Sequence, residues 1–100
     1  MKIIKEEAIP PTHLYHGTAH NILSEIEENG LSPMARQYVH LSEDIETASS
    51  VGKRKDKHPI ILVVNTDHAR DNGTKFYLGN EKVWLADSIP SEFIEVLKSN

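Results

Sequence analysis

The chain has 100 residues, a formal net charge of −4 and no cysteine. This length predicts a single domain, and the lack of cysteine excludes disulfides and thiolate metal ligands. The acidic balance argues against gripping nucleic acid through overall charge, although a local basic site stays open. No apolar run reaches membrane-spanning length and the first residues are too charged for a secretion signal, so we expect a cytoplasmic protein that does not contact membranes.

The first third of the chain predicts a lead-in, a strand and a helix. Residues 1–11 form a polar lead-in that ends in two prolines, and one domain is expected over residues 12–100. Alternation over residues 12–16 predicts a strand. Apolar residues at helical spacing predict a helix over residues 19–29, with Thr18 as its N-cap and an Asn-Gly stop.

The remaining elements alternate in type. Residues 38–41 predict a second strand, followed by a helix that Ser42 caps and Gly52 ends. The five consecutive aliphatic residues 60–64 predict a strand buried on both faces. Residues 66–73 predict a short helical turn, and residues 75–78 and 83–85 predict a hairpin. Residues 91–99 predict a last strand or a short helix, of which we favour the strand. Together these elements predict an α+β domain with five or six strands and two main helices.

Two histidine-containing strand ends draw attention as candidate sites. His16 precedes Gly17-Thr18, a turn whose backbone groups could hold a planar amide or a phosphate. A strand end, a bend and a helix cap explain the same residues without any ligand. His40 alternates with its apolar neighbours, so it faces the same side as Ser42, either in a polar cleft or on a solvated sheet surface.

The six histidines do not form a metal motif. His13 and His16 are three apart on a strand and therefore face opposite sides, and His58 and His68 fall in other segments. The sequence also contains no phosphate-binding loop, no dinucleotide-binding glycine fingerprint and no nucleophile elbow. We therefore expect no metal.

The order of the short motifs is more specific than any one of them. From about Leu14 to Ile94 the chain resembles the C-terminal, ADP-ribosyltransferase-like lobe of the tRNA 2′-phosphotransferase family. The motifs that carry the resemblance are LYHGT, NGL, SPM-x-R, VHLSED, VGKR, G-x-x-FY, N-x-x-VWL and IP-x-x-FI, in this order. The resemblance implies a split two-sheet core with a cleft between the sheets. It also implies use of NAD⁺ to move ADP-ribose onto an RNA 2′-phosphate, with loss of nicotinamide and release of a cyclic ADP-ribose phosphate.

The resemblance assigns cofactor-binding roles to residues of both strand ends. His16 and Gly17 would line the nicotinamide-ribose pocket, with Thr18 ordering the turn. Ser42 would contact the cofactor's ribose and phosphates, and Arg54 would reach the pyrophosphate. Arginine forks suit a diphosphate, which agrees with that assignment.

The resemblance assigns the catalytic roles to Arg36 and His40. Arg36 would act on the phosphate of substrate or NAD⁺, and His40 would join it in the cleft. Val83 stands where many other ADP-ribosyltransferases carry a glutamate, which is consistent with an acceptor that is already anionic and needs no general base. Glu81 faces the same way as Val83 by strand periodicity, so it could supply the acid, or it could be a solvated hairpin residue.

Three departures from the family pattern widen the functional choice. Only about eleven residues precede the predicted fold, so we expect the family's N-terminal RNA-binding lobe to be absent. Tyr38 replaces a histidine, and the hairpin carries an insertion. The main hypothesis is ADP-ribosyl transfer to a phosphate or nucleic-acid acceptor. One alternative is a minimal toxin or effector acting on protein or RNA, with an antitoxin partner. The other is a non-catalytic module, either one that binds NAD⁺ or ADP-ribose or one lobe of an enzyme whose missing lobe comes from a separate protein.

Overall fold

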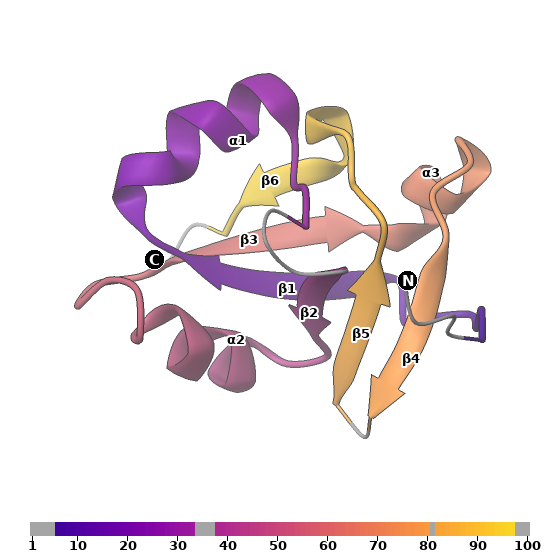
Figure 1. Cartoon of the computed structure of the whole chain (residues 1–100), viewed down its shortest axis with the longest axis horizontal. Coiled ribbons are helices and arrows are strands. Elements are labelled where there is room, and N and C mark those ends of the chain that lie inside the picture. Colours follow the sequence, from indigo (N-terminus) through magenta and orange to yellow (C-terminus); the bar gives the residue numbers. More distant parts are fainter. Residues whose placement is uncertain (1–5, 34–37, 81, 98–100) are drawn as a thin grey trace.

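The computed structural model describes residues 6–33, 38–80 and 82–97. Figure 1 labels its elements along the chain. The strands are β1 (His13–Thr18), β2 (Val39–Ser42), β3 (Ile60–Asn65), β4 (Phe76–Asn80), β5 (Val83–Ala86) and β6 (Ile94–Val96). The helices are α1 (Leu23–Asn29), α2 (Ile45–Gly52) and α3 (Thr66–Asp71), with short 3₁₀ turns η1 (His20–Ile22) and η2 (Ser91–Phe93). No helix in the described ranges is long and apolar enough to cross a membrane.

The described strands form one antiparallel sheet in the order β4-β5-β2-β1-β3-β6. This confirms the predicted α+β class. It does not show the expected two separate sheets, because β1 and β2 join the two halves. The join is narrow, however, since the only registered pair between them is Tyr15 with Ser42. Figure 1 shows β4 and β5 running across the direction of β1 and β3, so the sheet bends strongly at this join.

The opposite edge of β1 is fully paired. Its ladder with β3 runs over six residue pairs, from His13 with Asn65 to Thr18 with Ile60. Antiparallel pairing of this length fixes which side chains share a face. Leu14, His16 and Thr18 therefore point to one face of β1, and Tyr15 and Gly17 point to the other.

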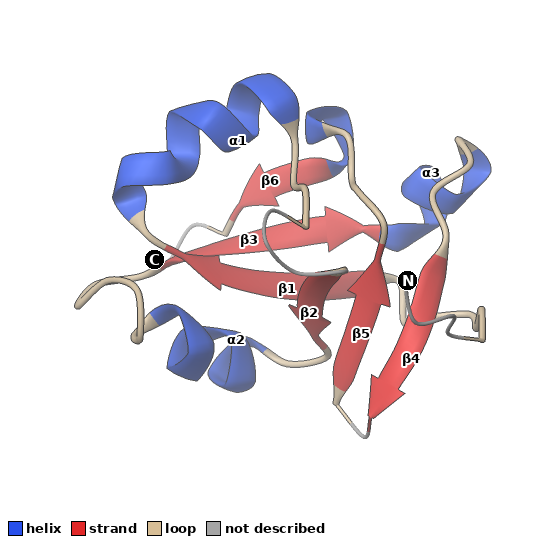
Figure 2. Ribbon diagram, in the orientation of Figure 1, coloured by secondary structure: helices blue, strands red, loops and turns tan. Residues whose placement is uncertain are grey.

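Helices cover both faces of this half of the sheet, as Figure 2 shows with α1 above and α2 below the strands. Ile26 of α1 belongs to the same buried cluster as Leu14 and Leu62. On the other face, α2 packs against Gly17. Because each face has its own helix, β1 and β3 carry apolar side chains in both directions. The cluster also contains Leu31, Val39, Leu41, Val64, Phe76, Trp84, Ile89 and Phe93.

Both helix caps predicted from the sequence are wrong. Thr18 is the last residue of β1, and neither η1 nor α1 has a side-chain cap. Ser42 is the last residue of β2 and is buried. The cap of α2 is Asp44, whose Oδ1 accepts a hydrogen bond from the Thr47 amide at 2.6 Å. The predicted glycine stop after α1 is confirmed, because Gly30 has a φ of 78°.

The second half of the chain follows the predicted order with local differences. Burial along β3 alternates between fully and partly buried, so one face is covered less completely than the sequence suggested. The helical turn after it is a short α-helix, α3, which makes three α-helices among the described residues rather than two. β4 and β5 form the predicted hairpin. The last segment, predicted as a strand or a short helix, contains the 3₁₀ turn η2 followed by the short strand β6.

Candidate functional site

A pocket of about 440 Å³ opens where β1 and β2 separate. Its walls come from these two strands, from α1 with the loop that follows it, and from the end of α2. This volume is within the usual range for small-molecule sites. The pocket brings together six residues predicted from the sequence, namely His16, Gly17, His40, Ser42, Arg54 and Val83.

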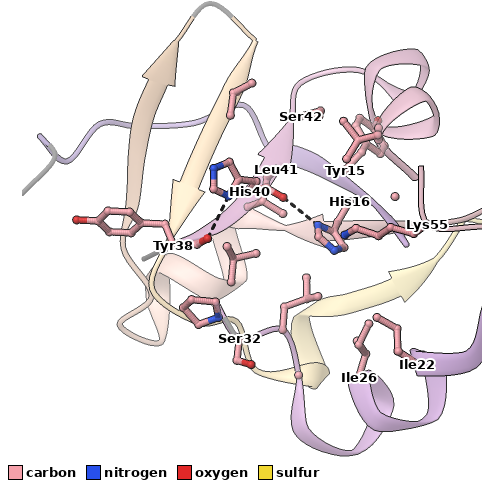
Figure 3. Close-up of a pocket in the computed structure, with 18 of the residues that line it drawn as sticks. Tyr15, His16, Ile22, Ile26, Ser32, Tyr38, His40, Leu41, Ser42 and Lys55 are labelled. Atoms are coloured by element: carbon pink, nitrogen blue, oxygen red, sulfur yellow. Dashed lines mark hydrogen bonds between the residues drawn. The ribbon is translucent and has the colours of Figure 1, made fainter. Parts of the chain in front are cut away.

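The pocket exists because the backbone ladder between β1 and β2 stops. Continuing the register from Tyr15 with Ser42 would pair Gly17 with His40, but no such pair forms. Instead the Nδ1 atom of His16 lies 2.9 Å from the His40 carbonyl oxygen. The histidine side chain thus takes an acceptor that a continuing ladder would have used. Figure 3 shows this bond and the open space beside it.

The hydrogen bond defines the protonation of His16. A carbonyl oxygen only accepts, so Nδ1 must carry the proton, and in the neutral ring Nε2 is an acceptor. Burial lowers the pKa of His16 below its ordinary value of 6.5, and the positive charge of Lys55 lowers it further, against the opposing effect of the bond to the His40 carbonyl. At neutral pH the site therefore contains a neutral imidazole that can accept a hydrogen bond from a ligand hydroxyl.

His40 is oriented in a similar way. Its Nδ1 lies 3.1 Å from the carbonyl oxygen of Tyr38 and donates to it. The Tyr38 ring is buried and packs on Tyr77, with ring centroids 5.4 Å apart and planes inclined by 56°. The Tyr77 hydroxyl in turn donates to Asp87 at 2.9 Å. A chain of contacts from the β4–β5 hairpin thus supports the backbone that holds His40.

Gly17 is required by packing rather than by backbone conformation. A Cβ atom there would lie 1.9 Å from the Ala48 carbonyl oxygen of α2. Gly52, at the end of α2, would bring a Cβ within 3.2 Å of the Gly17 Cα. The two glycines allow α2 to lie directly on β1. This close approach sets the end of α2 beside His16, and it is a further role for Gly17 besides the predicted contact with the cofactor.

The end of α2 supplies a basic corner to the pocket, which we define as Arg54 and Lys55. Both side chains are exposed and both residues line the pocket. Figure 3 shows Lys55 beside His16, in agreement with its effect on the pKa of that ring. Arg54 was predicted as a pocket residue, whereas Lys55 was not. Its position in the sequence, directly after Arg54 at a helix end, was the available signal.

An apolar wall formed by Ile22 at the end of η1 and Ile26 of α1 faces the two histidines. Ile22 and Ile26 lie on the opposite side of the pocket from Ser42 in Figure 3, and Leu31 and Val51 also line it. The sequence predicted a helix from this apolar spacing, and Ile26 belongs to the core. Ile26 also lines the pocket, so this residue contributes to both the core and the pocket. A flat, apolar ring is the kind of ligand group that such a wall accommodates.

Three of the predicted site residues are not among the residues that line the pocket in the described part of the chain. Thr18 is fully buried at the end of β1 and does not line it, and its hydroxyl has no hydrogen-bond partner among the described residues. Arg36 and Glu81 lie outside the described residues. Within the described part of the chain, no three histidine or carboxylate side chains are grouped to hold a metal ion.

Comparison with known proteins identifies the family of this chain. Residues 1–88 match the family model described as RNA 2′-phosphotransferase, Tpt1/KptA family. The chain is 73% identical over 99 residues to a probable RNA 2′-phosphotransferase of Bacillus thuringiensis subsp. konkukian, covering 99% of this chain and 54% of the relative. It is 59% identical over 93 residues to one of Acetivibrio thermocellus, covering 93% and 51%.

The same coverage recurs with a probable RNA 2′-phosphotransferase of Fusobacterium nucleatum, at 48% identity over 90% of this chain and 50% of the relative. The chain thus spans about half the length of these curated relatives. The family match extends over most of the chain and includes both histidine-containing strands of the pocket. The chain therefore belongs to the RNA 2′-phosphotransferase, Tpt1/KptA family.

Proposed function

We propose that the pocket binds NAD⁺ and that the chain forms the NAD⁺-binding part of an RNA 2′-phosphotransferase. The observation that supports this most directly is the convergence of His16, His40, Ser42 and Arg54 on one pocket in a member of this family. In this proposal the chain corresponds to the ADP-ribosyltransferase-like lobe. The two three-stranded halves that meet at β1 and β2 correspond to its two sheets, and the cytoplasm is its compartment.

The residues present fit the chemical groups of NAD⁺. The basic corner of Arg54 and Lys55 suits a diphosphate, since guanidinium and ammonium groups make charge-assisted hydrogen bonds to phosphate oxygens. The apolar wall that includes Ile22 and Ile26 suits a flat base. His16 Nε2 suits a ribose hydroxyl, because the bond to the His40 carbonyl leaves this nitrogen as an acceptor. The pocket thus offers a separate kind of partner to each part of the dinucleotide.

NAD⁺ supplies an activated ADP-ribosyl group whose bond to nicotinamide breaks during transfer. The protein's task is to orient the reacting ribose and manage charge, since the acceptor phosphate is itself the nucleophile. A neutral His16 positions a hydroxyl without adding positive charge next to a cationic reaction centre. Val83 lines the pocket with an apolar side chain, which is consistent with an anionic acceptor that needs no deprotonation. Arg36 on the acceptor phosphate, and Glu81 as an alternative acid, remain predictions.

The test is calorimetric titration with NAD⁺, followed by measurement of nicotinamide release with an RNA oligonucleotide that carries an internal 2′-phosphate. We expect binding by the wild-type chain, and binding weakened at least tenfold by His16→Ala. His13→Ala is the matched control, because His13 lies exposed on the same strand and outside the pocket. Absence of NAD⁺ binding by the folded wild-type chain would sink the proposal.

Nicotinamide release divides the remaining possibilities. Release that depends on the 2′-phosphate and disappears in Arg36→Ala and His40→Ala would establish transfer by this chain. NAD⁺ binding without nicotinamide release would mean that the chain binds NAD⁺ but needs a further protein segment for the reaction. The match to only about half the length of the relatives would be consistent with that result. Full activity of a Glu81→Ala variant would remove that residue from the reaction.

A further inference from the structure

Asp56 joins two segments that flank the pocket. Its Oδ2 atom accepts from the backbone amide of His20 at 3.1 Å and from Nδ1 of the same histidine at 3.2 Å. Its Oδ1 atom accepts from the backbone amide of His58 at 3.0 Å. One carboxylate therefore ties the start of η1, directly after β1, to the loop that leaves α2. We refer to Asp56, His20 and His58 as the carboxylate clasp.

The clasp lies beside the basic corner. Asp56 directly follows Lys55, and its amide donates to the Gly52 carbonyl oxygen at 3.0 Å. The Lys55 amide donates to the same carbonyl at 2.9 Å, and the Arg54 amide donates to Val51 at 3.2 Å. The backbone after α2 thus forms a tight turn. Backbone hydrogen bonds fix this turn at the end of α2. The Asp56 side chain links the turn to His20 at the start of η1.

The other end of the clasp is also close to pocket residues. His20 lies four positions after His16 and two before Ile22, and both of these line the pocket. The clasp therefore connects the wall that carries the apolar groups to the corner that carries the positive charges. These bonds hold the two segments that flank the pocket together.

We infer that Asp56 is a positioning residue that holds Arg54 and Lys55 in place for the diphosphate of NAD⁺. The inference rests on the proposed function, because it assigns a role toward the ligand of the same pocket. Asp56 itself does not line the pocket. Asp56 acts through the basic corner, because it orders the exposed loop that carries Arg54 and Lys55 before NAD⁺ binds. The entropy cost of ordering this loop on binding is then smaller.

The clasp is intact over the working pH range. The amides of His58 and His20, followed by the His20 ring, lower the pKa of Asp56 to about 2. A carboxyl group with a depressed pKa contributes its stabilisation above its ordinary pKa of 3.8 and loses it as the pH falls through about 2. Asp56 is therefore ionised, and able to accept all three bonds, in any neutral assay buffer.

The experiment is NAD⁺ titration of a double-mutant cycle. We expect Asp56→Ala to weaken binding about three- to tenfold, the range expected for one or two side chains that must be ordered on binding. In a chain that already carries Arg54→Ala and Lys55→Ala, adding Asp56→Ala should change the affinity less than about twofold. Asp56→Asn keeps one acceptor oxygen and should fall between wild type and Asp56→Ala. Asp71→Ala, an exposed aspartate at the end of α3, is the control.

Each outcome decides the point. Wild-type affinity in Asp56→Ala would overturn the inference while leaving the proposed function standing. The same loss in both backgrounds would also overturn it, since Asp56 would then act independently of the basic corner. Absence of NAD⁺ binding by the wild-type chain would overturn the proposed function and this inference with it. Faster amide hydrogen exchange at His20 and His58 in ligand-free Asp56→Ala would support the clasp, and unchanged exchange there would overturn it.

Discussion

The two edges of β1 differ sharply in backbone pairing, although the same six residues form both edges. Toward β3 the strand is paired along its whole length, whereas toward β2 it has one registered pair and one bond from the His16 side chain. Backbone groups that leave a ladder need other partners or exposure to solvent or ligand. The paired edge thus holds the fold together, and the opened edge provides the space for a site.

Burial also differs between the paired core residues of the closed edge and the two histidines of the opened edge. Leu14 and Val64 pair across the closed edge and are fully buried. Across the opened edge, His40 is exposed and His16 is only partly buried. The comparison teaches that stability and ligand binding depend on different edges of one strand. Substitutions at the two edges should therefore separate these properties.

The largest expected effect is at the closed edge. Leu14→Ala should lower the free energy of unfolding by about 2–5 kcal/mol, because it leaves a cavity in a tightly packed core. Urea denaturation followed by circular dichroism measures this loss. Leu78→Ala is the matched control, since Leu78 is 48% exposed and its truncation should cost within about 0.5 kcal/mol. Equal losses in the two variants would contradict the assignment of Leu14 to the core.

An intermediate effect is expected where β1 meets α2. Gly17→Ala should lower the free energy of unfolding by about 1–3 kcal/mol, because the new methyl group must push the Ala48 backbone away. It should also weaken NAD⁺ binding, since the basic corner moves with the end of α2. Ser50→Ala, an exposed site on α2, controls for the substitution itself. Wild-type stability in Gly17→Ala would show that α2 does not press on β1.

The smallest effect on stability is expected at the opened edge. His16→Ala removes one hydrogen bond and should cost about 0.5–1.5 kcal/mol, despite the large loss of NAD⁺ binding proposed above. Urea denaturation at neutral pH measures it, with His13→Ala as the control. A loss comparable to that of Leu14→Ala would mean that the opened edge also carries the fold, and the comparison would fail.

The same variant tests the pKa of His16. Because this pKa is lowered in the folded state, the unfolded chain binds the proton more readily as the pH falls through 6.5. Wild-type stability should therefore decrease between about pH 7 and pH 5.5, and His16→Ala should remove that part of the decrease. Urea midpoints at the two pH values measure the difference. An unchanged pH dependence in the variant would contradict the lowered pKa.

Much of the fold could be predicted from local patterns. The apolar spacing of α1, the aliphatic run of β3 and the β4–β5 hairpin are all confirmed. Errors occur at the ends of β1 and β2, where Thr18 and Ser42 have good capping chemistry. Thr18 instead pairs with Ile60, and Ser42 pairs with Val83. Pairing with a distant strand outweighs a local preference for a cap, and the sequence of the strand end alone does not reveal that partner.

The candidate site was predicted in part. Six of the predicted residues line the pocket. They could be predicted because their motifs, and the order of these motifs, resemble those of the family that the comparisons identify. Lys55 and the apolar wall of the pocket were missed. An apolar stripe looks the same whether it covers core or reaches a pocket, and an exposed lysine looks the same whether it faces solvent or a ligand. Only the packing of α1 and α2 against β1 distinguishes these cases.

The sequence by itself predicted most of the helices and strands, the family and six residues that line the pocket, because these depend on residue identity and spacing along the chain. The tertiary structure decided that β1 and β2 share a single registered pair, that His16 donates across the gap, and that Asp56 joins the two walls. These facts depend on which segments meet in space. Hydrogen bonds between residues 24 and 36 positions apart arise from that meeting, and no local pattern encodes them.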